Sequence, residues 1–122
     1  MLNILKNQLH TAPIGFFDSG VGGLSIWNET HHLLPHEATI YIADSANAPY
    51  GENSKERIID LCIKNTEMLL SLNCKLIVVA CNTATTNAIS YLRNKYDIPF
   101  IGIEPATKPS VLSTKTGRIG IL

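Results

Sequence analysis

The chain has 122 residues, with ten basic and ten acidic side chains, so its formal net charge is zero. Apolar residues make up 45% of it and charged residues 16%, a composition too apolar and too weakly charged for an intrinsically disordered segment. This length suits a single domain. The basic residues are scattered along the sequence, so the charge pattern indicates neither a nucleic-acid partner nor a membrane partner.

The first half of the sequence predicts two strands, each followed by a helix. Residues 14–17 are apolar and precede a glycine-rich turn, and residues 24–34 then have helical spacing up to a proline. Residues 39–43 are β-branched and aromatic, which predicts a second strand, and a loop follows over residues 44–53. Ser54 is a good N-cap for a long helix. We expect the apolar face of that helix to contain Ile58, Cys62, Leu69 and Leu72.

The second half continues the alternation of strand and helix. Residues 76–80 form a continuous apolar run, as expected in the middle of a parallel sheet that is covered on both faces. A helix over about 83–96, with Thr83 as its cap, precedes a fourth strand at residues 100–103. This helix is expected to bury Ala84, Ala88, Ile89 and Leu92. The pattern predicts an α/β fold, a doubly wound and mainly parallel sheet with helices on both faces.

The last segment predicts one more helix and strand. Residues 104–116 are predicted to form a short helix, in which Pro109 either lies in the first turn or kinks the helix. Gly117 suits the C′ position that follows a helix. Residues 118–122 are apolar and predict the start of a fifth strand.

Polar residues follow each of the first four predicted strands. They are Asp18 and Ser19, residues 44–51, Cys81 to Thr83, and Glu104. Ligands of open parallel sheets bind outside the carboxyl ends of the strands, so we expect all four groups at one edge.

Cys81 is the most informative of these residues. It follows a buried strand and precedes a helix, where backbone N–H groups and the helix dipole favour a thiolate. Its neighbour Asn82 can donate a hydrogen bond to a carboxylate. The alternative is a small buried residue, which a free cysteine usually is; the flanking Asn-Thr favours the reactive thiol. Cys62 is expected in the core and Cys74 at the opposite edge.

Two other strand ends have both a functional and a structural interpretation. Asp18 can bind a substrate ammonium group or direct a proton, or it can cap a helix. Tyr50 and Gly51 can place a hydroxyl and a backbone N–H over a small ligand, or they can form an ordinary turn. The turn glycines faintly match a dinucleotide-binding motif, but Ser25 replaces the third glycine and Asp18 would repel a pyrophosphate.

Cysteine and histidine usage bears on metals and on the compartment. Three cysteines without paired spacing favour a reducing, cytoplasmic environment, and the first ten residues lack the features of a secretory signal. No CxxC spacing occurs, and the four histidines lie far from Cys81 in sequence, so no metal site is expected. The histidines are His10, His31, His32 and His36.

Together these motifs resemble the glutamate racemase branch of the aspartate/glutamate racemase superfamily. The matching pieces are Phe17-Asp-Ser-Gly-Val-Gly-Gly-Leu24, Pro49-Tyr-Gly51, Val79-Ala-Cys-Asn-Thr-Ala84 and Ile98-Pro-Phe-Ile-Gly-Ile-Glu-Pro105. The resemblance implies a cofactor-independent interconversion of L- and D-glutamate, which supplies D-glutamate for peptidoglycan. One cysteine thiolate removes the α-proton, and a second cysteine returns a proton on the opposite face.

The resemblance also implies roles for individual residues. Cys81 corresponds to one of the two cysteines, and Asp18 assists proton transfer as well as binding substrate. The remaining substrate-binding residues are Ser19, Tyr50, Gly51, Asn82 and Thr83. An arginine usual in the family before Pro-Tyr-Gly is absent from Ser45-Ala-Asn-Ala48, which affects loop anchoring more than the type of reaction.

The family has a further domain that carries the second cysteine in a Cys-Thr-His-type motif, which this sequence lacks. We therefore expect residues 1–12 to be an N-terminal extension, 13–105 a racemase-type α/β domain and 106–122 a crossover towards that second domain. The expected function is that of the amino-terminal part of a glutamate racemase, inactive alone. It would bind glutamate and would self-associate or pair with a complementary carboxy-terminal part. The alternative is a non-catalytic amino-acid- or carboxylate-binding domain, or a decayed remnant.

Overall fold

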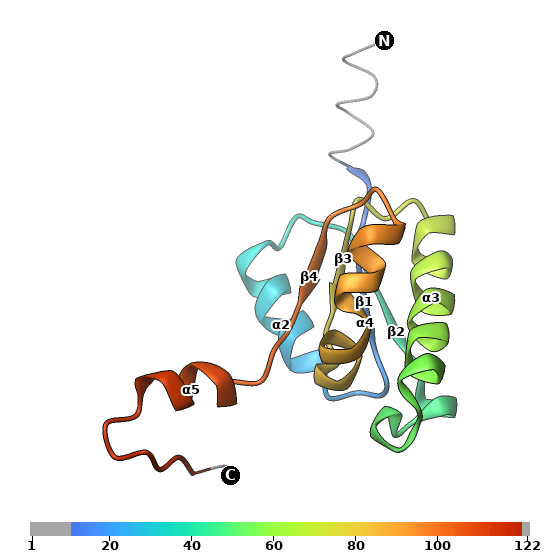
Figure 1. Cartoon of the computed structure of the whole chain (residues 1–122). Coiled ribbons are helices and arrows are strands. Elements are labelled where there is room, and N and C mark those ends of the chain that lie inside the picture. The colour runs from blue at the N-terminus through green and yellow to red at the C-terminus, as the bar shows by residue number, and fades with distance from the viewer. Residues whose placement is uncertain (1–10, 121–122) are drawn as a thin grey trace.

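Four short apolar runs of the sequence pair side by side in one sheet. The computed structural model describes residues 11–120, and within them the strand order is β2-β1-β3-β4, with every neighbouring pair parallel. Helices cover both faces of the sheet, which confirms the predicted α/β class (Figure 1). The strands are β1 (Ile14–Asp18), β2 (Thr39–Ala43), β3 (Leu76–Val79) and β4 (Phe100–Gly102).

The helices lie close to the positions that the hydrophobic spacing predicts. In Figure 1, α3 and α4 lie together on one face of the sheet and α2 lies on the other. The predicted loop between β2 and α3 contains two short 3₁₀ turns, η1 and η2. The bounds are α2 (Leu24–Leu33), η1 (Ser45–Asn47), η2 (Tyr50–Glu52), α3 (Lys55–Ser71), α4 (Asn82–Lys95) and α5 (Thr107–Ser113).

Alternation along the two inner strands divides the hydrophobic core into two parts. Phe17 and Val79 belong to the larger cluster, which packs beneath α3 and α4. Phe16 and Val78 face the other way and pack against Trp27 of α2. All four strand residues are buried, because β1 and β3 have a neighbouring strand on each side and helices on both faces. The two faces meet at the carboxyl edge of the sheet.

Both ends of α3 are stabilised by local hydrogen bonds. Ser54 Oγ accepts a hydrogen bond from the Arg57 amide at 3.2 Å, which confirms the predicted N-cap. At the other end, Asn73 adopts a positive φ of 59°, and the Cys74 amide donates to the Leu69 carbonyl at 3.2 Å. This is a Schellman motif with asparagine in place of the more common glycine. It turns the chain from α3 into β3.

Several expectations for the helix ends and the last segment are wrong. Leu72 is 46% exposed, because α3 ends at the residue before it. Gly117 has a φ of 70°, but α5 ends at Ser113, so this glycine lies beyond the C′ position. Residues 118–120 are not a strand, since α5 leads away from the sheet (Figure 1) and no strand lies beside them; residues 121–122 of that expected strand lie outside the described residues. Pro109 does occupy the first turn of α5.

The long helices do not have membrane-spanning character. Within residues 11–120, each helix is too short or too polar to cross a bilayer.

Candidate active site

The carboxyl ends of the four parallel strands share one edge of the sheet, as predicted. Asp18 ends β1, Asp44 follows β2, and Cys81 comes two residues after β3. Ser19 connects two of these groups directly, because its hydroxyl lies near both Asp18 and Cys81. Glu104, after β4, is exposed and lines a separate hollow of about 480 Å³ between α4 and α5.

Cys81 is itself the N-cap of α4. Its Sγ accepts a hydrogen bond from the Ala84 amide at 3.4 Å, and its carbonyl accepts one from the Thr85 amide at 2.9 Å. The expectation that Thr83 caps the helix is therefore wrong, because the cysteine sulfur already occupies the capping position. The amides of Asn82 and Thr83 belong to the first turn of α4 and precede its first intrahelical hydrogen bond. They are suited to bind an anionic group.

Ser19 lies between the thiol and the carboxylate. The Cys81 thiol donates to Ser19 Oγ across 3.6 Å, and the Ser19 hydroxyl donates to Asp18 Oδ1 across 3.4 Å. Cys81 and Asp18 are 6% and 7% exposed, and Ser19 is half-buried. A thiol, a hydroxyl and a carboxylate thus follow one another across the ends of β3 and β1, an arrangement along which a proton can move.

Two backbone amides fix the Asp18 carboxylate. The Ser19 amide donates to Oδ1 and the Gly23 amide donates to Oδ2, both at 2.8 Å. Gly23 is the N-cap residue of α2, so Asp18 stabilises the start of that helix from five positions away rather than as its cap. The carboxylate is held in one orientation at the edge of the sheet.

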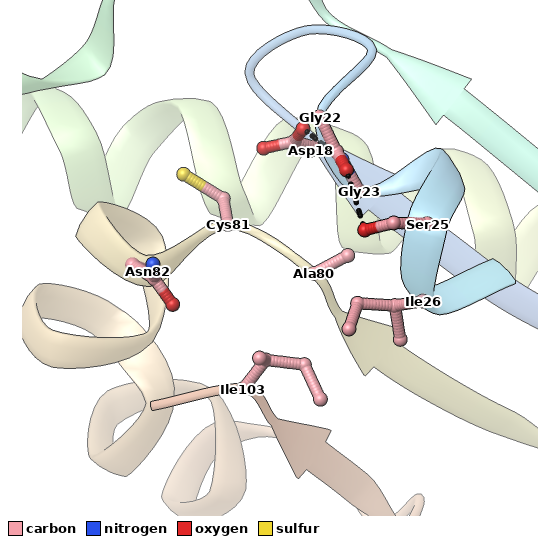
Figure 2. Close-up of a pocket in the computed structure, with 9 residues that line it drawn as sticks. All are labelled: Asp18, Gly22, Gly23, Ser25, Ile26, Ala80, Cys81, Asn82 and Ile103. Carbon is pink, nitrogen blue, oxygen red and sulfur yellow. Dashed lines mark hydrogen bonds between the residues drawn. The ribbon is translucent and has the colours of Figure 1, made fainter. Parts of the chain in front are cut away.

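A hollow of about 310 Å³ opens beside these groups (Figure 2). Ile26, Ala80 and Ile103 form an apolar wall, and Asp18 and Asn82 supply polar groups. Cys81 also lines it, and Figure 2 shows its sulfur and the Ala80 methyl pointing in different directions. An apolar wall with a few convergent polar groups suits a small ligand.

A buried hydrogen-bond network holds the turn that contains Tyr50 and Gly51. Tyr50 is 1% exposed; its hydroxyl donates to Asp44 Oδ2 at 2.6 Å and accepts from Asn65 Nδ2 at 2.9 Å. Burial, followed by the hydrogen bond to Asp44, raises the pKa of Tyr50 far above its usual value, so the hydroxyl stays protonated. This hydroxyl is occupied inside the protein, whereas Gly51 of the same turn is exposed. The turn contacts α4.

Sequence reasoning missed Asn65. It is 3% exposed on the face of α3 that buries Ile58, Cys62 and Leu69. An asparagine within an otherwise apolar helical face is the available signal, since a buried amide needs a hydrogen-bond partner. That partner, Tyr50, lies 15 residues away in sequence and could not be identified from the pattern.

The three thiols lie in different surroundings. Cys62 is fully buried, and burial, with smaller contributions from the charges of Cys81 and Asp44, raises its pKa to about 12. Burial also raises the pKa of Cys74, which precedes β3 at the opposite edge of the sheet. Cys81 alone of the three lines the hollow at the carboxyl edge.

We expect Cys81 to react with iodoacetamide at neutral pH at least about tenfold faster than the other two cysteines, because the thiolate is the reacting form. Peptide mapping by mass spectrometry after timed alkylation of the folded chain measures the three rates. The same reaction in urea, where the three thiols should react alike, is the control. Faster alkylation of Cys62 or Cys74 in the folded chain would contradict the assignment of Cys81.

The described histidines lie away from this site. His31, His32 and His36 are exposed, and the His31 ring stacks on Trp27 with 5.4 Å between ring centroids. His10 lies outside the described residues. Across residues 11–120, no cluster of three or more His, Cys, Asp or Glu side chains is arranged to hold a metal ion.

Comparison with known proteins shows which family this chain resembles. The Asp/Glu/Hydantoin racemase family model matches residues 25–122. A glutamate racemase of Herpetosiphon aurantiacus is 54% identical over 110 residues, which cover 90% of this chain and 43% of the relative. A glutamate racemase of Clostridium botulinum is 52% identical over 115 residues, covering 94% of this chain and 45% of the relative.

Solved structures agree with the sequence relatives. The crystal structure of Escherichia coli glutamate racemase in complex with L-glutamate and the activator UDP-MurNAc-Ala aligns with a TM-score of 0.77 and 42% identity. It covers 87% of this chain and 41% of that one. A glutamate racemase isoform from Bacillus anthracis aligns with the same TM-score and 37% identity, covering 87% and 40%. This chain therefore spans less than half the length of these relatives, and it belongs to the Asp/Glu/Hydantoin racemase family.

Proposed function

We propose that this chain forms one half of a glutamate racemase site, in which the Cys81 thiolate exchanges a proton with the α-carbon of glutamate. The observation that carries the proposal is the position of Cys81. Its sulfur caps the N-terminus of α4 with the Ser19 hydroxyl 3.6 Å away, and Cys81 is one of the residues that line the hollow at the carboxyl edge. The family membership of the chain supports the reaction class.

The proton chemistry uses three side chains in this proposal. Cys81 as thiolate takes the α-proton, the C–H electron pair stays on the substrate as a carbanion, and the thiol returns a proton to the same carbon. Ser19 steadies the sulfur through its hydroxyl. Asp18, held by two amides, assists the transfer and attracts the substrate ammonium group.

Substrate binding is assigned to the helix start and the neighbouring turn. The amides of Asn82 and Thr83 and the Asn82 side chain are suited to bind a carboxylate. The main chain of Tyr50 and Gly51 contributes further donors from a turn that contacts α4. Glutamate is the proposed substrate because the relatives are named glutamate racemases, and the structure of one of them is in complex with L-glutamate.

A racemase needs an acid or base on each face of the planar carbanion, and this chain offers a thiol on one face. Its other two cysteines are buried away from the hollow. We propose that the second face is completed by a complementary carboxy-terminal part, whose equivalent lies in the remainder of the longer relatives. The complete site would supply D-glutamate for cytoplasmic peptidoglycan synthesis, without a cofactor.

A test that separates proton exchange from inversion uses both glutamate enantiomers in D₂O. A single base reaches only one face, so we expect the chain to exchange the α-proton of one enantiomer and leave the other unlabelled. The labelled molecules should keep their configuration. Proton NMR measures the label, and chiral chromatography measures inversion.

The outcomes distinguish the proposal from its alternative. Binding of glutamate without exchange of either enantiomer would indicate a non-catalytic amino-acid-binding domain. Rapid inversion by the 122-residue chain would show that it contains a second acid, contrary to the half-site proposed here.

A further inference from the structure

The glycine-rich turn that carries Ser19 is tied to the sheet by a tyrosine. We infer that Tyr41 of β2 is a positioning residue for the Cys81 site: its hydroxyl anchors the turn and thereby keeps Ser19 beside the Cys81 sulfur. The inference rests on the proposed function for its catalytic consequence. Its structural part concerns only the contact between Ser19 and Cys81.

Strand alternation explains how Tyr41 reaches the turn. Ile40 and Ile42 pack against the core beneath α3 and α4, whereas Tyr41 points to the α2 face. Asp18 also follows Phe16 onto the α2 face of the adjacent strand, one position before the turn. The Tyr41 hydroxyl therefore lies below the turn and donates to the Gly20 carbonyl at 3.1 Å.

The turn has few other constraints. Gly20, Val21 and Gly22 follow Ser19, and Val21 and Gly22 are exposed. In the described part of the chain, the remaining hydrogen bonds to residues 20–22 come from the first turn of α2, through the amides of Leu24 and Ser25 and the Ser25 hydroxyl. Among the hydrogen bonds to residues 20–22, the one from Tyr41 is thus the bond that comes from the sheet, while Ser19 and Gly23 on either side donate to Asp18 of β1. Losing the Tyr41 hydrogen bond would free the backbone next to Ser19.

Close packing at Gly23 holds the same hydroxyl in place. A Cβ on residue 23 would lie 2.8 Å from the Tyr41 hydroxyl oxygen and 2.7 Å from the Ala80 Cβ. The tyrosine hydroxyl therefore fills the space left by the missing side chain. Gly23 also donates its amide to Asp18, which accepts the Ser19 amide as well. The Tyr41 hydroxyl therefore packs against the residue that ends the turn, and Asp18 joins that residue to the start of the turn.

The hydroxyl is a stable donor. Burial, and then the negative charges of Asp18 and Cys81, raise the pKa of Tyr41 to about 12. It therefore keeps its proton over the range in which a cysteine thiolate forms.

The test is Tyr41→Phe, which keeps the ring and removes the hydroxyl, with Ser19→Ala and the double variant completing a cycle. The first readout is the rate of Cys81 alkylation by iodoacetamide from pH 6 to pH 9. The second is α-proton exchange of glutamate in D₂O. Tyr96→Phe is the matched control, because it removes another tyrosine hydroxyl bond, to Glu67 Oε1 at 3.0 Å, away from the site.

We expect Tyr41→Phe to lower the Cys81 alkylation rate at neutral pH by about threefold to tenfold, the size of one lost hydrogen bond. Once Cys81 loses its proton, the Ser19 hydroxyl can rotate to donate to the thiolate. The alkylation profile should therefore move to higher pH in Tyr41→Phe, as it should in Ser19→Ala. In the Ser19→Ala background, the tyrosine change should have less than about a twofold effect. Tyr96→Phe should leave the rate and its profile unchanged.

Two results would overturn the inference: an alkylation profile in Tyr41→Phe equal to that of the unmodified chain, or an equal additional loss in the Ser19→Ala background. The alkylation arm does not depend on glutamate. If the unmodified chain exchanges no α-proton, the proposed function fails while alkylation still decides the role of Tyr41. If exchange occurs, it should fall with alkylation in Tyr41→Phe.

Discussion

Replacing Cys81 with serine is expected to slow α-proton exchange of glutamate by about 10²- to 10⁴-fold, the usual contribution of a positioned acid or base. The hydroxyl is close in size to the thiol but far less acidic, so it cannot act as the base. Serine is also a favourable N-cap, and the new oxygen can accept the Ala84 amide in place of the sulfur. The start of α4 should therefore persist, and the loss should be chemical.

Cys74→Ser is the matched control for this change. Cys74 is 6% exposed, as Cys81 is, but it precedes β3 at the opposite edge and lines no part of the hollow. Its replacement should leave the exchange rate within about twofold once equal fractions of folded protein are compared by circular dichroism. Exchange by Cys81→Ser within about threefold of the unmodified rate would exclude Cys81 as the base.

Much of the fold follows from local pattern. The apolar run of β3 predicts an inner strand because a strand with helices on both faces has no solvent-facing side, and the structure confirms it. Ser54 predicts the start of α3 because its side chain can satisfy a free helical amide, and it does so. These features depend on neighbours within a few residues, which is why the sequence alone indicates them.

The helix boundaries that failed depend on details of local competition. Cysteine is an uncommon N-cap, so the sequence favoured Thr83, yet the Cys81 sulfur accepts the Ala84 amide. At the end of α3, Asn73 adopts the left-handed conformation that usually indicates glycine, and the helix ends before Leu72 reaches the core. In both cases a less common residue supplies the interaction.

The candidate site could be predicted only in part. Strand ends brought Asp18, Ser19 and Cys81 to one edge because parallel strands share their direction. The contacts of Tyr41 and Asn65 were missed because each joins segments at least 15 residues apart. A tyrosine in a predicted strand is interpreted as a core residue, and the pattern does not show that its hydroxyl donates to the Gly20 carbonyl.

Alkaline pH is expected to destabilise the folded chain, and Cys62 should account for much of the loss. Its thiol lies fully buried between α3 and the sheet, and its pKa rises from an ordinary 9.0 to about 12 in the folded state. Above pH 9 the unfolded chain therefore releases the Cys62 proton while the folded chain retains it. The contribution of Cys62 to the free energy of unfolding is fully present below pH 9 and is lost as the pH rises towards 12.

The expected loss from this one group is about 1 kcal/mol by pH 10 and about 4 kcal/mol by pH 12, at 1.36 kcal/mol per pH unit and proton. Tyr41 and Tyr50 add to the loss above pH 10, since their pKa values also rise on folding. Urea unfolding between pH 8 and pH 10 isolates the cysteine contribution, because both tyrosines are still largely protonated in the unfolded chain over most of that range.

Cys62→Ala tests the assignment, since alanine cannot ionise. Its stability at pH 8 should be lower than that of the unmodified chain because a buried sulfur is lost, but the decline from pH 8 to pH 10 should become shallower by about 1 kcal/mol. Cys74→Ala provides the comparison, because burial raises that pKa as well but the side chain is less deeply enclosed. We expect it to change the slope less. An unchanged slope in Cys62→Ala would mean that the Cys62 thiolate is tolerated in the folded chain, so that alkaline unfolding begins at other groups.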